Sequence, residues 1–323
     1  MPNLLTTSTL PDVVYHYCSV DTFFQIITNH TLRLSDIEKS NDFMEKKWAI
    51  RQCLEHIKNN LTNPAYSCSK QPELASALLA GMEQQFQRYN TMILAACFSS
   101  ERDLLSQWRG YGDNGYGVCI GVSSGTAFER AFRRAQRYLG LKGSARDLPD
   151  GLLFHNVQYS TENIESICMR MFCIHMQWLP LRVSIEMAAA ELVRMMYPVL
   201  PFFKSRAFSE EAEWRCVYYP PLPAPPYEND TFDEGAFDEQ LVQQVTEQQL
   251  DLFRMLPINY RLREKNLVPY RDISFSSPCQ SFIRSVTIGP KCPLDRETVK
   301  LFLERYRIPI DMKNIYLSDV SYR

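Results

Sequence analysis

The stretch Cys97–Val122, CFSSERDLLSQWRGYGDNGYGVCIGV, contains the most informative local pattern in the chain. The apolar run Met92–Phe98 ends inside it and predicts a buried strand, while Ser100 and two acidic residues suit the start of a short helix that ends near Trp108. A second apolar run, Gly117–Val122, predicts another strand. We therefore expect a strand, a short helix, a glycine-rich turn and a strand in succession.

The turn concentrates much of the backbone freedom of the chain. The sequence of 323 residues has 12 glycines, and six of them fall between Gly110 and Gly125. The segment GYGDNG matches the pattern G-x-G-x-x-G, but the dinucleotide-binding fingerprint needs a strand before the glycines and a helix after them. Here the order is reversed, so the pattern does not predict a Rossmann fold. A tight turn that uses Asp113, Asn114 and Gly115 explains these glycines.

The residues beside the glycines are candidates for ligand binding. Gln107, Trp108, Arg109 and Tyr111 crowd the same turn. An Arg and a Tyr on a loop that a ligand can approach closely suit the recognition of anions and rings. The structural alternative is a packed corner that Trp108 anchors, and the sequence leaves both interpretations open.

A second group of polar residues is EEAEWR, Glu210–Arg215, immediately before the apolar run CVYY. The period of two along a strand places Glu211, Glu213 and Arg215 on one face. Such a face is either a site or a surface ladder of ion pairs, each worth well under about 1 kcal/mol.

Two further positions have a structural and a functional interpretation. His16 lies within the apolar strand pattern VVYHYC, where a histidine is either a core residue or a ligand-binding group. Asn41 and Asp42 precede a helix, and Asp42 with Glu45 has the spacing of a capping box. Capping explains both residues, and ligand contact is the alternative.

The rest of the chain predicts an α+β protein with a mixed or antiparallel split sheet and helical insertions. Strand patterns and helix patterns are interleaved without a regular repeat, and a final strand-helix-strand unit covers Ile283–Leu317. The stretch PPLPAPP, Pro220–Pro226, cannot continue a sheet. We therefore expect one domain over residues 1–323, with a Pro-rich and then acidic loop or linker at 220–240. A Gln-rich helix is expected to follow and to end near Met255.

Composition excludes several classes of function. A net charge of −2 and a pI near 6.3 provide no general surface for nucleic acid, although a local basic patch remains open. The longest apolar region is interrupted by charged residues and prolines, and the N-terminus does not resemble a secretory signal, so a cytoplasmic protein without a membrane span is expected. The ten cysteines include no C-x-x-C pair, so free thiols are expected and no metal.

Several segments, taken in order, resemble one bacterial family, domain of unknown function 2971. They are YHYCSVDTFFQII, TLRLSDIEKSNDFME, the long stretch described first, FSEEAEWRCVYY, SVTIGP and the terminal LSDVSYR. A strand with a histidine, then a helix and a short strand, is also similar to the opening of ADP-ribosyltransferase-like proteins. That similarity implies a split sheet, NAD as a substrate and transfer of ADP-ribose to an unknown protein, nucleic-acid or small-molecule target, in phage defence or a toxin module.

The same similarity implies roles for individual residues. His16 would contact the NAD ribose, Trp108 or Tyr111 would lie near the nicotinamide, Arg109 would meet the diphosphate and Glu213 would be the catalytic carboxylate. Gln107, Arg215 and Asn41 complete the candidate cofactor-binding set.

Two other classes of function stay open. The first is a non-catalytic protein that binds a nucleotide or a partner. The second is a metal-dependent nuclease that would use Asp36, Asp42 and Glu45.

Overall fold

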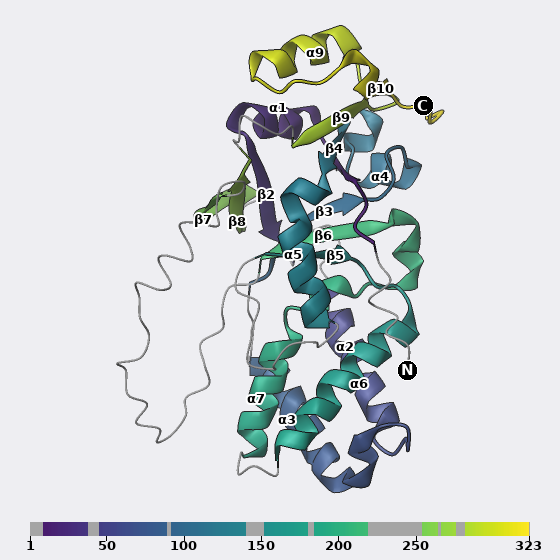
Figure 1. Cartoon of the computed structure of the whole chain (residues 1–323), viewed down its shortest axis with the longest axis vertical. Coiled ribbons are helices and arrows are strands. Elements are labelled where there is room, and N and C mark those ends of the chain that lie inside the picture. The colour runs from purple at the N-terminus through teal and green to yellow at the C-terminus, as the bar shows by residue number, and fades with distance from the viewer. Residues whose placement is uncertain are drawn as a thin grey trace.

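The computed structural model describes residues 9–37, 45–88, 92–139, 152–179, 184–218, 254–263, 266–275 and 282–322. The chain forms an elongated α+β protein, as predicted, with a sheet in its middle and upper part and a group of helices at the opposite end from the C-terminus (Figure 1). The expected loop or linker at 220–240 lies outside the described residues.

The sheet contains ten strands. Its main path runs β10 (Ile315–Leu317), β9 (Ile283–Ile288), β4 (Val118–Ser123), β1 (Val13–Cys18), β3 (Leu94–Ser99), β2 (Thr31–Asp36), β8 (Asn266–Ser274) and β7 (Arg254–Arg263), and β6 (Glu213–Tyr218) and β5 (Leu152–Asn156) branch from β3. The β9–β10 pair is parallel and the other pairs of named strands are antiparallel. The sheet is therefore mixed, which was one of the two expected forms.

Strand β3 is the point at which the sheet forks. One edge of β3 pairs with β6 along its whole length, from Leu94 to Ser99. The other edge is shared, because β2 pairs with Leu94 and Ala95 while β1 pairs with Ser99. Between these contacts the backbone around Cys97 faces the fork between β1 and β2.

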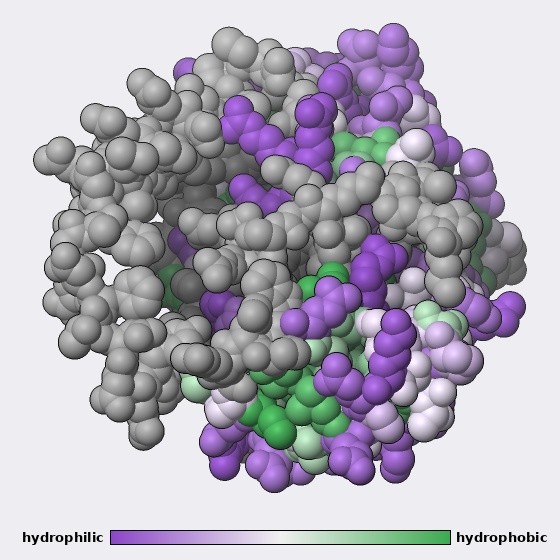
Figure 2. All heavy atoms as spheres, turned by 60° about the horizontal axis from the view of Figure 1, so that its bottom comes forward, coloured by the Kyte–Doolittle hydropathy of each residue, from purple (hydrophilic) through white to green (hydrophobic). Residues whose placement is uncertain are grey.

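Two hydrophobic cores cover the two faces of the sheet. Helices α1 (Val20–Asn29), α5 (Ser124–Leu139) and α9 (Arg296–Arg305) supply the core on the face of Phe98 and Trp214. Helices α2 (Glu45–Asn60), α3 (Pro72–Arg88), α6 (Thr161–Trp178) and α7 (Ile185–Met196) form the second core, which reaches the sheet at Ala95 and Val217. In the view of Figure 2, apolar residues show at several places among polar ones.

The glycine-rich turn is a place of close backbone approach. It joins α4 (Leu105–Gly110) through the short helical turn η4 (Asp113–Gly115) to β4. A Cβ at Gly112 would collide with the ring of Trp108, and one at Gly117 would collide with the carbonyl oxygen of Cys18. Asp113 and Asn114 have positive φ, as the tight-turn interpretation requires. Trp108 is fully buried and donates to Asp103 (2.6 Å), so it anchors a packed corner.

Strands β7 and β8 were not predicted from the sequence. A helix was expected to reach Met255, whereas Met255 lies in β7, which pairs with β8 as a hairpin on β2. Two prolines interrupt the strand pattern. Pro269 is tolerated because it lies within a long two-stranded arm. The other proline lies between Met255 and Ile258, where the register of the two strands shifts.

We expect Gly117→Ala to lower the free energy of unfolding by about 3 kcal/mol or more, because the new methyl group meets backbone atoms that cannot rotate away. Gly110→Ala is the matched control, since a Cβ at Gly110 meets nothing within 4 Å. In that variant stability should stay the same or rise by up to about 1 kcal/mol through helix propensity. Chemical denaturation of the two proteins measures the difference, and equal stability would show that the turn tolerates side chains.

Candidate functional site

A chain of five buried or half-buried charged residues lies at the fork of the sheet. Arg215 of β6 pairs with Glu45 at the start of α2 and with Glu213, two residues before it on the same strand. Lys204 then joins Glu213 (3.2 Å) to Glu211 (2.6 Å). We call these five residues the charged cluster. Its formal charge is −1, because three carboxylates face two cations.

Arg215 uses all of its hydrogen-bonding capacity inside the protein. Its Nε and Nη2 donate to the two carboxylate oxygens of Glu213 (2.7 and 2.8 Å). Its Nη1 and Nη2 donate to the two oxygens of Glu45, and Nη1 also donates to the carbonyl oxygen of Pro201. A guanidinium has five N–H donors, so none is left for a ligand. The position of Arg215 therefore fits a role in holding the site together.

Sequence reasoning placed Glu213 and Arg215 on one face of a strand, and the structure agrees. They are not a surface ladder, however, because Glu213 is 6% and Arg215 1% exposed. The register pairs Glu213 with Ser99 and Arg215 with Cys97, so both project from the face of the sheet that carries Ala95. Glu211 precedes the strand, at the end of η7 (Arg206–Glu211), and Ala212 turns the chain between them with positive φ.

The two carboxylates that Lys204 joins, Glu213 and Glu211, differ in acidity. Burial raises the pKa of Glu213, but the charges and hydrogen bonds of Arg215 and Lys204 outweigh burial and lower this pKa to about 2. Burial raises the pKa of Glu211, and Lys204 offsets the increase only in part. Glu213 is therefore an anion at neutral pH, and Glu211 is the more easily protonated of the two.

Tyr111 brings an aromatic ring to the charged cluster. Its side chain is 38% exposed, yet burial raises the pKa of Tyr111; the charge of Lys204 opposes this rise, and Glu211, Cys97 and Glu213 add to it. The hydroxyl end thus lies among the charges while part of the ring reaches solvent. Cys97 is also partly exposed, although it is in the middle of the sheet. Tyr111 and Cys97 are thus the partly exposed residues beside the buried charges.

His16 lies on the other face of β3. Its neighbours along β1, Val14 and Cys18, belong to the core under α1 and α5, and its ring lies 5.6 Å from that of Phe98. Its Nδ1 donates to the carbonyl oxygen of Cys97 (2.9 Å), which leaves Nε2 of the neutral ring as an acceptor. Burial lowers the pKa of His16, which favours the neutral form. His16 and Glu213 thus approach the same residue of the fork from opposite sides.

The other candidates around the turn are dispersed. Trp108 is enclosed by the corner that it anchors. Arg109 is exposed and lies over the ring of Tyr322, with 4.9 Å between Cζ and the ring centroid. Gln107 is buried and is one helical turn before Tyr111, so the two share a face of α4. Asn41 lies outside the described residues.

Lys204 was not predicted as a member of the site, and Glu45 was considered as a capping residue and as a nuclease candidate but not as a partner of Arg215. Lys204 follows the apolar segment Leu200–Phe203, where an isolated lysine gives no signal of burial. Its 2% exposure is the feature that marks it, since a lysine is rarely buried unless it is paired. Cys97 was interpreted as a small core residue, and its partial exposure depends on the fork.

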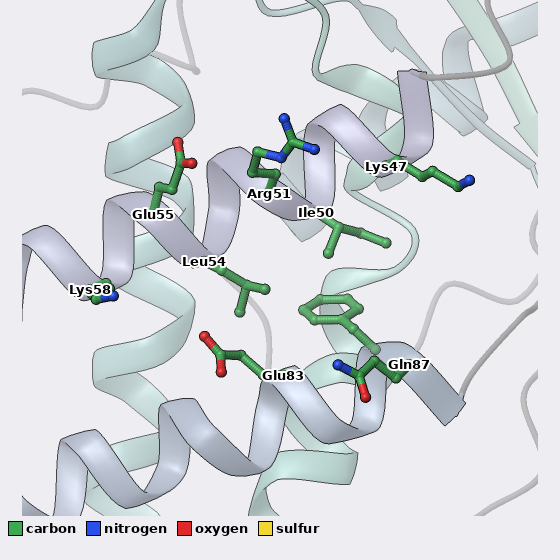
Figure 3. Close-up of a pocket in the computed structure, with 9 residues that line it drawn as sticks. Lys47, Ile50, Arg51, Leu54, Glu55, Lys58, Glu83 and Gln87 are labelled. Atoms are coloured by element: carbon green, nitrogen blue, oxygen red, sulfur yellow. The ribbon is translucent and has the colours of Figure 1, made fainter.

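Two hollows on the surface do not include the charged cluster. One, of about 430 Å³, lies between α2 and α3, with Ile50, Leu54 and Phe86 forming its apolar part (Figure 3). The other, of about 850 Å³, lies beside the start of α5 and includes Arg133 and Arg284. Neither contains a residue that the sequence analysis proposed as catalytic or cofactor-binding.

Neither a metal centre nor a membrane span is found in the described part of the chain. No group of three or more His, Cys, Asp or Glu side chains that could hold a metal ion occurs there. Of the residues considered for a nuclease, Glu45 is bound to Arg215 and Asp42 lies outside the described residues. None of the described helices is long and apolar enough to cross a bilayer.

Residues 107–216 match the model of a family described as "Protein of unknown function (DUF2971)". The resemblance to this family is therefore confirmed over the segment that contains Tyr111, Lys204 and Glu213. No curated protein and no solved structure matches the chain.

We expect Arg215→Met to lower the free energy of unfolding by about 3–5 kcal/mol, because Glu45 and Glu213 would stay buried without their shared cation. The control is Arg88→Met, which breaks an exposed pair with Glu186 and should cost under about 1 kcal/mol. Denaturant titration compares the two. Equal losses would mean that the charged cluster does not hold the fold together.

The pKa of Glu213 also predicts how stability depends on pH. Because this pKa is about 2 in the folded protein and near 4.5 without the fold, Glu213 stabilises the protein above about pH 4.5. That stabilisation is lost as the pH falls from about 4.5 to 2. In Glu213→Gln the free energy of unfolding should be lower at pH 7 and should fall less steeply in acid than in wild type. The exposed Glu186→Gln should retain the wild-type profile, and an unchanged slope in Glu213→Gln would contradict the pairing.

Proposed function

We propose that the protein binds NAD at the fork of the sheet and transfers its ADP-ribose group to a target. The observation that carries this proposal is geometric: α4, which the partly exposed Tyr111 follows, packs against η7, and η7 ends at Glu211 beside Lys204 and Glu213. A ring face beside anionic groups suits a cationic aromatic ring, and the nicotinamide ring of NAD is one.

The reaction needs a carboxylate that stays ionised. The bond between the ribose carbon and the nicotinamide nitrogen breaks, and its electron pair leaves with nicotinamide. A nucleophile of the target then bonds to that carbon and loses its proton. Positive charge develops on the ribose during this exchange, and a fixed anion stabilises that charge more than it stabilises the ground state. Arg215 and Lys204 keep Glu213 anionic and fix its direction.

The other side chains at the fork fit a dinucleotide. His16, on the opposite face of β3, fixes its Nδ1 on the backbone of Cys97, and only its Nε2 remains as an acceptor, which a ribose hydroxyl would have to reach through the fork. Tyr111 offers its ring and a hydroxyl among the charges. Glu211, whose pKa is raised, suits the acceptance of the proton that the target releases. Arg215 donates hydrogen bonds to both carboxylate oxygens of Glu213 and so holds it in one orientation.

Release of nicotinamide from NAD, measured by chromatography, tests the proposal. We expect wild type to release nicotinamide and Glu213→Gln to do so about 100-fold more slowly or worse, as for the loss of one group that stabilises developing charge. Tyr111→Leu should raise the KM for NAD, whereas Tyr111→Phe should retain most of the affinity. Glu191→Gln, which removes a carboxylate on α7 outside the fork, should match wild type.

Each variant is first compared with wild type by its unfolding transition. If Glu213→Gln does not fold, Glu211→Gln replaces it, because Glu211 is at the edge of the cluster. Normal nicotinamide release in folded Glu213→Gln, or none in wild type with protein, RNA and DNA fragments present as targets, would contradict the proposal.

A second function is a nucleotide-binding protein without catalysis. One observation favours it: both oxygens of Glu213 already accept hydrogen bonds from Arg215, and one also accepts from Lys204. A carboxylate so engaged has little capacity left for a substrate hydroxyl. Calorimetry distinguishes the two functions, because binding of NAD that Tyr111→Leu weakens, with no release of nicotinamide, would favour the binding protein.

A further inference from the structure

The glycine-rich turn and the C-terminal segment build an alternating stack of aromatic rings and cations. Lys291 lies over two rings, with its Nζ 3.9 Å from the centroid of Tyr322 and 5.3 Å from that of Tyr116. Arg109 also lies over Tyr322, at 4.9 Å. We call Tyr116, Lys291, Tyr322 and Arg109 the tyrosine–cation ladder. Three parts of the chain contribute to it: α4 with the turn after it, the loop after β9 and the C-terminal segment.

The two cations of the ladder have no acidic partner. Neither Arg109 nor Lys291 forms an ion pair with any residue of the described structure. Other cations, such as Arg33 and Arg102, also lie over tyrosine rings, but in the ladder Lys291 lies over two rings and Tyr322 receives two cations. Tyr116 is 50% exposed, so part of its ring is free for another contact. The ladder thus presents unneutralised positive charge beside an accessible aromatic surface.

The fold holds the ladder in place. Tyr322 donates to Asn114 (2.5 Å), and the preceding residues Ser318 and Asp319 donate to Asp103 (2.6 and 2.7 Å). Asp103 also accepts from the buried Trp108, so the segment is tied to the corner beneath it. In Figure 1 the C-terminal end lies beside α4, in agreement with these bonds.

Gly115 makes this arrangement possible. It has φ of +88°, and a Cβ on it would lie 3.1 Å from both the Lys291 and the Tyr322 side chains. A residue other than glycine would therefore be strained and would press on the two central members of the ladder. Glycine is therefore needed at position 115 so that the side chains of Tyr322 and Lys291 can pack against the turn.

The ladder is separate from the fork. Arg109 and Tyr111 are two residues apart at the end of α4, so they project about 200° apart around the helix axis. Tyr111 reaches the charged cluster, and Arg109 reaches Tyr322 on the opposite side. A ligand of the ladder is therefore not the group that Tyr111 and Glu213 would hold.

We propose that the ladder binds single-stranded nucleic acid. Arg109 and Lys291 would contact phosphates, and a base would stack on the exposed ring of Tyr116. Alternation of rings and cations suits this polymer because bases and phosphates also alternate along it. An acidic peptide would use the cations and leave the rings without a partner. A duplex would bind more weakly, since its bases are already stacked on one another. This inference does not depend on the proposed reaction with NAD.

Fluorescence anisotropy of the full chain with labelled single-stranded DNA and RNA, longer than about 16 nucleotides, tests the proposal. Tyr116→Ala should weaken binding about fivefold or more through the lost stacking. The double variant Arg109→Ala/Lys291→Ala should lower the slope of log affinity against log salt by about 1.4, since each phosphate contact on a single strand contributes about 0.7.

The control is Lys58→Ala/Arg88→Ala, which removes two exposed cations at the helical end of the molecule. It should leave the affinity and the salt slope unchanged. All variants are compared by their unfolding transitions, and Tyr116→Leu replaces Tyr116→Ala if the latter does not fold. NAD binding is measured on the same proteins.

Four results would overturn the inference. They are no binding of either single strand by wild type, equal losses in the ladder and control variants, a duplex bound as tightly as a single strand, and loss of NAD binding in the ladder variants with strand binding intact. The last would mean that the ladder holds the dinucleotide. Absence of nicotinamide release would contradict only the proposed reaction.

Discussion

The salt bridges of Arg215 connect the two halves of the molecule. Its guanidinium joins β6 to the first residue of α2, and its remaining donor meets the carbonyl oxygen of Pro201. Burying a guanidinium costs much free energy unless every donor is satisfied, so Glu45, Glu213 and Pro201 must all be in place for it to be tolerated. The helical end and the sheet are thus held in one arrangement, and the carboxylate of Glu213 is fixed as an anion by the same contacts.

The fork and the charged cluster depend on each other. Because β1 and β2 share one edge of β3, Cys97 is left partly exposed, and the charges of β6 lie next to it. A continuous sheet would pair this edge and close the approach. The turn after α4 then places Tyr111 toward the cluster and Arg109 toward Tyr322, so one short helix separates two surfaces with different chemistry.

Local features of this fold could be predicted from the sequence, and long-range ones could not. The helix Val20–Asn29 is an example of a local feature, because Ser19 caps its first turn and its apolar residues have helical spacing. The common face of Glu213 and Arg215 followed from strand periodicity. Neither segment contains a sequence pattern that predicts the ion pair of Arg215 with Glu45, because this pair depends on tertiary packing. The burial of Lys204 was missed for the same reason, whereas the local hairpin of β7 and β8 was missed because prolines interrupt its strand pattern.

The separation of Glu45 and Arg215 by 170 residues has a consequence for synthesis of the chain. A ribosome adds roughly 5–20 residues per second, so Glu45 emerges about 10–30 s before its partner. During that interval α2 cannot be buried with its carboxylate unpaired and must remain in contact with water. The nascent N-terminal half is therefore expected to stay open, and final closure of the helical end waits for the last third of the chain.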